Sequence, residues 1–195
     1  MSHQPKTTYL TPEEYLSIER KAEYKSDYFN GEIFAMTGAS REHNLITTNI
    51  IGELRQQLKG KSCEVYPSNM RVRVPAARLY TYPDVVVVCG EPKFEDAYVD
   101  TLLNPTLIVE VLSRSTETYD RGRKFGYYRT IESLSAYLIV EQDEYKIEQY
   151  VKQADGRWLL SEETSLEGAI ELACVECRLA LSEVYERVDL SRSES

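Results

Sequence analysis

Residues 82–88, YPDVVVV, and residues 107–112, LIVEVL, are two strongly apolar stretches that carry one acid each. Nearly continuous apolar runs of this length are typical of strands that are covered on both faces of a sheet. Asp84 opens the first run, and Glu110 lies inside the second. A buried carboxylate costs free energy unless a cation or hydrogen-bond donors lie beside it. The two stretches therefore predict adjacent buried strands whose acids meet around a positive partner.

Two helices and a hairpin are predicted before these strands. The segment Thr11-Pro12-Glu13-Glu14 has the spacing of a capping box with proline at the first helical position, which predicts a helix over residues 11–20. The pair Asn30-Gly31 between apolar residues predicts a hairpin with a two-residue turn. Ser40 can cap a helix that runs to about residue 59. The buried stripe expected on that helix consists of Leu45, Thr48, Ile51, Leu54 and Leu58.

Strands dominate the rest of the chain. They are predicted over residues 64–67, 70–75, 85–88, 107–112, 136–140, 145–152, 158–160 and 169–173. Two more helices are predicted, over residues 119–131 and 181–188. The sequence has no internal repeat, Gly/Ser-rich linker or low-complexity stretch. We therefore expect one compact α/β domain over residues 9–188, between a flexible N-terminus at residues 1–8 and a flexible tail at residues 189–195.

The composition limits the class of protein. A chain of 195 residues with 42% hydrophobic content can bury one core but is short for two. No stretch approaches the roughly 20 apolar residues that a membrane-spanning helix needs. The start of the chain, Met1 to Lys6, has polar residues where a secretory signal would need an apolar centre. We therefore expect a cytoplasmic protein that has no membrane partner.

The cysteines are too few to form a disulfide scaffold in a chain of this size, and each has apolar neighbours, so we expect reduced core thiols. They are Cys63, Cys89, Cys174 and Cys177. The last two form one CxxC, but a structural zinc site needs four ligands, and neither a second CxxC nor an HxxxH is present. Packing is therefore the favoured role of this pair.

The charge is unevenly distributed along the chain. A net charge of −9 argues against a nucleic-acid partner if it is spread uniformly. Residues 131–195, however, hold 15 of the 32 acids and 6 of the 23 bases, so all the excess acid lies in the last third. Between Arg55 and Arg78 there are six bases and a single acid, Glu64. One interpretation is a local basic surface, and the other is scattered, solvated bases.

The two acids of the apolar stretches also have two interpretations. An acid at a strand edge can cap a helix or pair with an arginine, which is the ordinary structural role. Two such acids in the most apolar strands of one chain favour a functional site. Mg²⁺ takes a few carboxylate oxygens and keeps water positions open for a phosphate. We therefore predict that Asp84 and Glu110 are ligands of Mg²⁺ or Mn²⁺.

The residues around these acids resemble a known superfamily. Pro83-Asp84, with Glu110 26 residues after the aspartate, is similar to the PD-(D/E)XK nucleases. A longer pattern resembles the Uma family of restriction-endonuclease-like proteins, over about residues 9–186. Its elements are Pro83 to Val86, Val109 to Thr116, Asp120, Lys124 and Tyr128. The resemblance implies an α/β fold with a restriction-endonuclease-like core, α-β-β-β-α-β, in which helices flank a mixed central sheet and extra strands follow at the C-terminal end.

The lysine of the general motif is displaced in this chain. In Glu-x-Lys the lysine lies two residues after the acid, where this sequence has Leu112. Lys124, on the following predicted helix, can send its ammonium back toward Glu110, because the group only has to reach the site. Similar members of the family carry a lysine at the matching place. By resemblance, Asp84, Glu110 and Lys124 form the catalytic site, although Lys124 can also be an ordinary solvated helix lysine.

Glu32 and His43 are secondary candidates for a third ligand or a proton-transfer group. Glu32 can equally be a surface acid beside the hairpin turn, and His43 a capping or packing histidine. The hydroxyls of Ser113, Ser115 and Thr116 lack the surroundings of a hydrolase nucleophile. These three residues are expected to shape the turn after the strand and to cap the next helix.

The chemistry implied by the resemblance is metal-dependent endonuclease activity, with DNA as the expected substrate and partner. The alternative is a catalytically inactive module that kept the nuclease fold to bind nucleic acid or protein. The displaced lysine and the acidic total favour the inactive module, whereas the joint presence of the two acids and Lys124 favours the enzyme. Because duplex sites are two-fold symmetric, a homodimer is expected by analogy with restriction enzymes.

Overall fold

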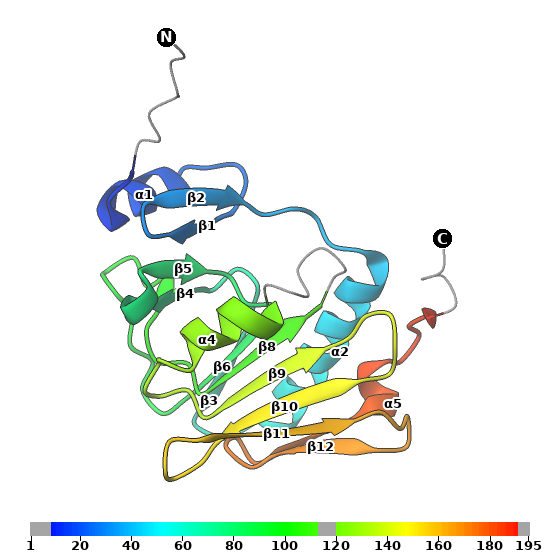
Figure 1. Cartoon of the computed structure of the whole chain (residues 1–195). Coiled ribbons are helices and arrows are strands. Elements are labelled where there is room, and N and C mark those ends of the chain that lie inside the picture. Colours follow the sequence, from blue (N-terminus) through cyan, green and yellow to red (C-terminus); the bar gives the residue numbers. More distant parts are fainter. Residues whose placement is uncertain (1–8, 113–119, 191–195) are drawn as a thin grey trace.

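A six-stranded mixed sheet contains both acidic stretches (Figure 1). In spatial order its strands are β11 (Trp158–Glu163), β10 (Ile147–Lys152), β9 (Ala136–Val140), β8 (Leu107–Val111), β6 (Val85–Cys89) and β3 (Cys63–Pro67). Strands β8 and β9 are parallel, and the other neighbours are antiparallel. This computed structural model describes residues 9–112 and 120–190. The expectations for residues 1–8, Ser113, Ser115, Thr116 and residues 191–195 therefore concern positions outside the described ranges.

Helices lie on both faces of this sheet, as predicted (Figure 1). The helical elements are α1 (Pro12–Glu19), α2 (Arg41–Gln57), the 3₁₀ turn η1 (Pro75–Ala77), the π-helical turn η2 (Asp120–Lys124), α4 (Phe125–Tyr128) and α5 (Leu181–Val184). Along the chain, α2, β3, β6, β8, η2 with α4, and β9 give the order helix, three strands, helix, strand. The predicted restriction-endonuclease-like core is therefore confirmed. The helix expected over residues 119–131 consists of η2 and α4, and is shorter.

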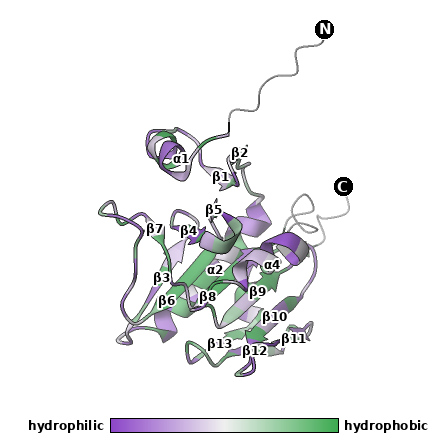
Figure 2. Ribbon diagram, turned by 60° about the vertical axis from the view of Figure 1, so that its left-hand side comes forward, coloured by the Kyte–Doolittle hydropathy of each residue, from purple (hydrophilic) through white to green (hydrophobic). Residues whose placement is uncertain are grey.

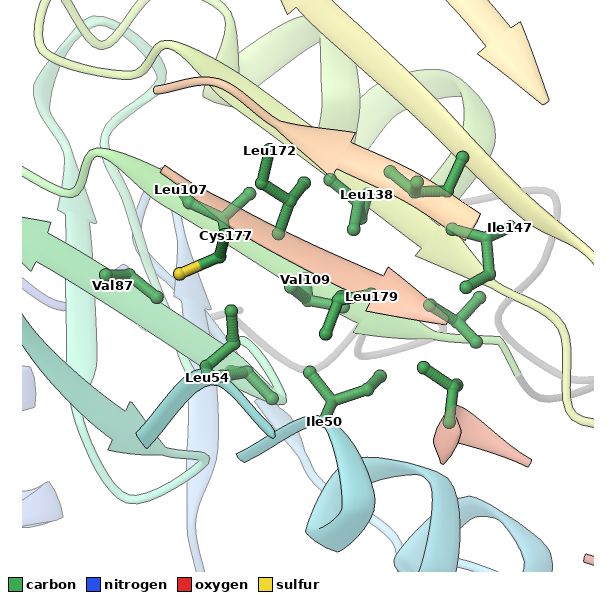
Figure 3. Packing of buried hydrophobic residues seen from close by; sticks show 14 of the residues in the cluster. Ile50, Leu54, Val87, Leu107, Val109, Leu138, Ile147, Leu172, Cys177 and Leu179 are labelled. Carbon is green, nitrogen blue, oxygen red and sulfur yellow. The ribbon is translucent and has the colours of Figure 1, made fainter. Parts of the chain in front are cut away.

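The main hydrophobic core lies between the six-stranded sheet and α2 (Figure 3). Ile50 and Leu54 of α2 face Val87 and Val109 of the sheet. A two-stranded hairpin, β12 (Ala169–Leu172) with β13 (Cys177–Ala180), closes the same core from the C-terminal part of the chain. Full burial of an aliphatic side chain stabilises the fold by about 1.5–3 kcal/mol. This layer therefore fixes the strands that hold the two acids.

The opposite face of the sheet carries a second cluster, built on the alternate residues of the same strands. Ile108 and Ile139 pack there against Tyr128 of α4. Because successive side chains of a strand point to opposite faces, apolar residues at nearly every position of β6, β8 and β9 supply both clusters at once. Figure 2 shows the result, a green apolar sheet inside a more hydrophilic periphery. Glu110, two residues after Ile108, points to this second face.

A five-stranded sheet lies beside the first one (Figure 1). Its strands are β2 (Glu32–Ala35), β1 (Ser26–Phe29), β5 (Leu79–Thr81), β4 (Arg71–Val74) and β7 (Thr101–Leu102). β4, η1 and β5 all come between β3 and β6 in the sequence. The chain thus leaves the six-stranded sheet after Pro67, contributes two strands to the second sheet, and returns at Val85.

The predicted start of the chain is confirmed in detail. Thr11 caps α1 through a capping box: Glu14 N donates to Thr11 Oγ1 (3.2 Å), and Thr11 N donates to Glu14 Oε2 (2.8 Å). In the hairpin of β1 and β2, Phe29 pairs with Glu32, so Asn30 and Gly31 form the two-residue turn. Both have positive φ, 47° and 101°, as such a turn requires.

The predicted buried stripe of α2 is confirmed at Leu54 and Leu58 but wrong at Thr48. Ser40 caps the helix as expected, its Oγ accepting from His43 N (3.0 Å). The buried residues within α2, however, are Ile46, Ile50 and Leu54, at strict four-residue steps, whereas Thr48 is exposed. The sequence offers apolar residues on two neighbouring faces of the helix. Only the packed sheet determines which of them is covered.

The expectation of four reduced thiols is also wrong. Cys63 and Cys89 are direct partners in the antiparallel register of β3 and β6, and they form a disulfide with a Cα–Cα distance of 4.0 Å. Their separation of 26 residues gives no sequence signal for this pairing. Cys174 and Cys177 are free and pack in or against the main core, as predicted. In the described parts of the chain, no helix is long and apolar enough to cross a membrane.

Candidate active site

Glu110 is the buried acid of the candidate active site. It lies on β8 with 3% of its surface exposed. Tyr128 of α4 donates a hydrogen bond from its hydroxyl to Glu110 Oε1 (2.8 Å). The Lys124 ammonium lies 2.8 Å from the same oxygen, and Lys124 is itself only 8% exposed. Lys124 is therefore a buried partner of the acid, not a solvated helix lysine.

The displaced lysine has a simple structural account. Leu112, two residues after Glu110, is 1% exposed and belongs to the apolar cluster on the same face of the sheet. The turn η2 crosses this face and ends at Lys124, and α4 follows directly with Tyr128. A side chain from the crossing helix thus supplies the ammonium that the general motif places on the strand.

Burial also changes the pKa of Tyr128. Its pKa is raised well above the ordinary value, first because the phenol is buried and next because the charge of Glu110 opposes ionisation. The hydroxyl therefore stays protonated and acts as a hydrogen-bond donor to the carboxylate at neutral pH.

Asp84 lies one residue before β6, at the open end of that strand. Its Oδ2 accepts a hydrogen bond from the backbone N of Val111 (2.8 Å), the residue after Glu110. His43 Nε2, from the first turn of α2, lies 3.2 Å from the same oxygen. Within residues 9–112 and 120–190, all the polar contacts of Asp84 go to Oδ2, and its side chain is 16% exposed.

Strand register brings the two acids next to each other. Val85 of β6 pairs with Val109 of β8, and continuing this antiparallel register places Asp84 opposite Glu110. Glu110 is reached by Lys124 from the face covered by α4. Asp84 is reached by His43 from the face covered by α2. The two pairs therefore meet at one end of the sheet, with Lys124 and His43 coming from opposite layers.

Glu32 lies apart from these two pairs. It opens β2, an edge strand of the five-stranded sheet, where it pairs with Phe29 beside the hairpin turn. The structure therefore brings Lys124 to Glu110 and His43 to Asp84, but holds Glu32 on a different sheet.

The row of the sheet that contains Glu110 continues to a second acidic position. Glu110 pairs with Ile139 of β9, and Ile139 pairs in turn with Glu148 of β10. Glu148 is 6% exposed and forms ion pairs with Arg121 of η2 and with Lys146 (3.2 Å). Burial raises the pKa of the Glu148 carboxyl, but the hydrogen bonds from Arg121 and Lys146 outweigh it, and the pKa lies below its ordinary value.

Comparison with known proteins identifies the family. A model of the family Uma2, described as "Putative restriction endonuclease", matches residues 12–182. The chain belongs to the Uma2 family. It is 42% identical over 156 residues to the uncharacterized protein sll1609 of Synechocystis sp. (strain ATCC 27184 / PCC 6803 / Kazusa), covering 80% of this chain and 88% of that protein. The uncharacterized protein slr1290 of the same organism is 35% identical over 187 residues, covering 95% and 97%.

A solved structure resembles this Uma2 protein in fold. It is described as a "putative nuclease belonging to DUF820 from Anabaena variabilis ATCC 29413". The TM-score is 0.74, and the match covers 90% of this chain and 97% of that one, at 15% identity. The likeness supports the restriction-endonuclease-like fold across nearly all of the chain.

The donor atoms of this Uma2 site suit a hard divalent cation. Asp84 and Glu110 offer carboxylate oxygens, and Asp84 keeps Oδ1 without a hydrogen bond to the described residues. Among residues 9–112 and 120–190, no cluster of three or more His, Cys, Asp and Glu residues could hold a metal ion. A site with two acids fits an ion such as Mg²⁺, which retains several water ligands, better than a fully protein-coordinated zinc.

Sequence reasoning missed Glu148 and Arg121 at this end of the sheet. The segment around Glu148, YKIEQYV, mixes polar and apolar residues, so an acid in it looks like part of a solvated face. Tyr128 was found only through the family resemblance. Glu148 could have been predicted only from the strand order β8, β9, β10, because this order places it in the same row as Glu110.

Proposed function

We propose that this Uma2 protein is a divalent-metal-dependent endonuclease that hydrolyses phosphodiester bonds in DNA. Asp84, Glu110 and Lys124 are the proposed catalytic residues, and the two acids are the proposed ligands of Mg²⁺ or Mn²⁺. Membership of a restriction-endonuclease family supports a nuclease. The cation, the DNA substrate, a cytoplasmic location and a homodimer remain parts of the proposal.

The 2.8 Å contact between Lys124 and Glu110 is the observation that carries this proposal. A buried acid and a buried lysine that meet by chance are rare, because each charge is costly to remove from water. Here they meet one residue from Val111, whose backbone N binds Asp84. Two acids and an ammonium thus lie at one end of the sheet, which is the set of groups that phosphodiester hydrolysis needs.

Each proposed residue has a role that follows from its contacts. Asp84 and Glu110 would hold the cation, which supplies positive charge to the phosphate and makes water more acidic. The Lys124 ammonium, held at Glu110, stabilises the negative charge that develops on the phosphate oxygens. His43, bound to Asp84 Oδ2, is the better placed of the two secondary candidates and would move a proton at its Nε2. Glu32 is a proposed third ligand only if its strand approaches the site when substrate binds.

Cleavage of supercoiled plasmid DNA tests the proposal. The purified protein should convert the plasmid to nicked and linear forms with Mg²⁺ or Mn²⁺, and should be inactive with EDTA. Asp84→Asn, Glu110→Gln and Lys124→Met should each lower the rate at least about 100-fold, because each removes a charge used in the transition state. Parallel reactions with single-stranded DNA and RNA determine the substrate class.

Matched variants away from the site control this experiment. Glu171→Gln changes an acid on β12 that pairs with Arg178 at the surface. Lys152→Met changes a lysine of β10 that donates to the backbone O of Glu132 (2.9 Å). Both should cleave at the parent rate. Equal cleavage by the parent and by Asp84→Asn would refute the proposed active site, since it would point to a contaminating nuclease.

A catalytically inactive module is the second candidate function. The observation that favours it is the closed ion pair itself, since Lys124 already neutralises Glu110 in this structure. Such a module would bind DNA without cutting it under any divalent cation. DNA binding by the parent without cleavage in Mg²⁺ or Mn²⁺ would therefore favour the module over the enzyme.

A further inference from the structure

Lys25 is a second lysine close to the proposed active site. It lies between α1 and β1, and is partly buried. Its Nζ donates to the backbone O of Ser68 (2.8 Å) and to Asn69 Oδ1 (3.1 Å), with a longer contact to Ser68 Oγ (3.4 Å). All three acceptors are neutral, and no described carboxylate forms an ion pair with Lys25. The ammonium is thus held in position by neutral acceptors, without an ion pair to a carboxylate among residues 9–112 and 120–190.

The pairing of β3 with β6 brings this ammonium to the same end of the sheet as Asp84. Pro67 of β3 pairs with Val85 of β6, so the turn at Ser68, which follows Pro67, and Asp84, which precedes Val85, lie at the same end of this strand pair. Since β6 lies between β3 and β8, Asp84 has the end of β3 on one side and Glu110 on the other. Lys25 Nζ also lies 5.4 Å from the centre of the Tyr82 ring, two residues before Asp84.

The electrostatics agree with this placement. Burial lowers the pKa of Lys25, and the charge of Asp84 is the foremost of the carboxylate charges that oppose this lowering, ahead of Asp27 and Glu19. The Lys25 ammonium and the Asp84 carboxylate are therefore close enough to influence each other without touching. The space between the Lys25 ammonium and the Asp84 carboxylate suits an anion that would bind both Lys25 and a metal held by Asp84.

We propose that Lys25 binds the phosphodiester substrate, donating a hydrogen bond to a non-bridging phosphate oxygen on the side of Asp84 opposite Lys124. This inference rests on the proposed nuclease function and adds a substrate-binding residue to it. An ammonium has three N–H donors. Two of them make the short bonds to Ser68 and Asn69, which fix the group, and the third makes only the long contact and can turn to the phosphate.

The salt dependence of DNA binding tests this role. Binding of a labelled duplex oligonucleotide is measured by fluorescence anisotropy at several KCl concentrations, with Ca²⁺ in place of Mg²⁺ and the DNA checked for integrity. Each phosphate contact contributes about 0.9 to the slope of log K against log salt. Lys25→Met should weaken binding about 10-fold at low salt and reduce this slope by about 0.9. Lys25→Arg should keep the slope, because it keeps the charge.

The controls separate binding from a purely structural role. Lys152→Met removes a lysine that is also held by a backbone carbonyl, at the far end of the six-stranded sheet, and should keep the parent slope. If Lys25 only fixes the turn at Ser68, Lys25→Met will lose thermal stability without changing the slope, and the inference is overturned. Should Lys25→Met fail to fold, Lys25→Gln, which can still donate to Ser68 O, gives the same measurement.

The two proposals fail in different ways. A parent protein that neither binds nor cleaves DNA overturns the nuclease function and the role of Lys25 together. A parent that cleaves DNA, with Lys25→Met indistinguishable from it in affinity and slope, overturns the role of Lys25 alone.

Discussion

Glu110 and Lys124 show how two costly side chains stabilise each other. Each is more than nine-tenths buried, and each would be strongly disfavoured there as a lone charge. Their 2.8 Å contact, with the hydrogen bond from Tyr128, compensates both. A buried pair of this kind adds little net stability compared with apolar residues, but the loss of one partner is expensive. This small net gain in stability agrees with the catalytic role that we propose for the pair.

Removing the cation alone should destabilise the fold. We expect Lys124→Met to lower the free energy of unfolding by about 3–5 kcal/mol, because it leaves the Glu110 carboxylate buried without its partner. Urea unfolding at pH 7 measures this. The double variant Glu110→Gln with Lys124→Met should recover much of the loss, since no unpaired charge remains. A loss in the single variant no larger than that of Lys152→Met would contradict the energetic role of the pair.

At the scale of single residues, the sequence predicted one of the two pairs. Glu110 stood out because an acid interrupts an apolar strand, and the family pattern supplied Lys124. The contact between His43 and Asp84 was not predicted, because the relative placement of α2 and β6 depends on packing across the whole sheet. Lys25 gave no sequence signal, since its acceptors at Ser68 and Asn69 come from a distant turn.

At the scale of elements, the local signals gave the most reliable predictions. The capping box of α1, the hairpin turn and the cap of α2 all depend on interactions within a few residues, and all are confirmed. The short strands β5, β7 and β13 were missed because they are defined by their partners and not by their own pattern. The buried face of α2 was predicted correctly at Leu54 and Leu58 but misplaced in the first half of the helix, since only the sheet selects it.

Two glycine-to-alanine substitutions, one in the hairpin turn and one in α2, should change the free energy of unfolding in opposite directions. Gly31 has a φ of 101°, and an added Cβ would lie 2.6 Å from Cδ1 of Tyr9. Gly31→Ala should therefore lower the free energy of unfolding by about 1–2 kcal/mol. Gly52 lies in α2 with open space around its Cα, and Gly52→Ala should raise it by about 0.5–1 kcal/mol. Chemical denaturation of both variants measures this, and effects of the same sign would contradict the account of the turn.

Arg20 connects α1 to the second sheet in a way that depends on pH. The hydrogen bonds from Arg20 lower the pKa of Asp100 to about 2, against the opposing effect of burial, and Arg71 adds to the lowering. Because the folded-state pKa lies below that of the unfolded chain, this contribution is complete above about pH 4. It is lost as the pH falls toward about 2.

The expected outcome is a pH-dependent difference between the parent and Asp100→Asn. Their unfolding free energies should differ by a constant amount above about pH 5, and the difference should shrink between about pH 4 and pH 2. Arg20→Met should remove the same part of the pH dependence, because it removes the main donor. Urea titrations at each pH give the values, and a difference that grows on acidification would show that the sign is wrong.

At the scale of the whole molecule, the predicted basic segment does not form one surface. Arg71 is 2% exposed and binds Thr101, Tyr82 and Asp100 inside the molecule. Arg73 pairs with Glu95. Only the bases at the C-terminal end of α2 gather at the surface, around a hollow of about 480 Å³. These are Arg55, Lys59 and Lys61. In the proposed nuclease, the approach to DNA would therefore depend on the proposed cation and on a few well-placed bases.

Cation binding should therefore appear in the thermal stability of the whole chain. At a Mg²⁺ or Mn²⁺ concentration ten times the dissociation constant, binding to the folded state adds about 1.4 kcal/mol. For a chain of this size the midpoint of unfolding should rise by about 3–6 °C. Differential scanning fluorimetry measures the shift, with Ca²⁺-free EDTA buffer as the baseline. Asp84→Asn should abolish it and Glu171→Gln should not, so an unchanged shift in Asp84→Asn would place the cation elsewhere.

The disulfide between Cys63 and Cys89 encloses the whole excursion of the chain between β3 and β6. Residues 63–89 form a covalent ring that includes β4, η1, β5 and Asp84. A protease that cuts once between Ser68 and Pro83 would open this ring without releasing a fragment. The nicked protein would migrate as one species until a reductant separated it into two pieces, one ending in the second sheet and the other beginning there.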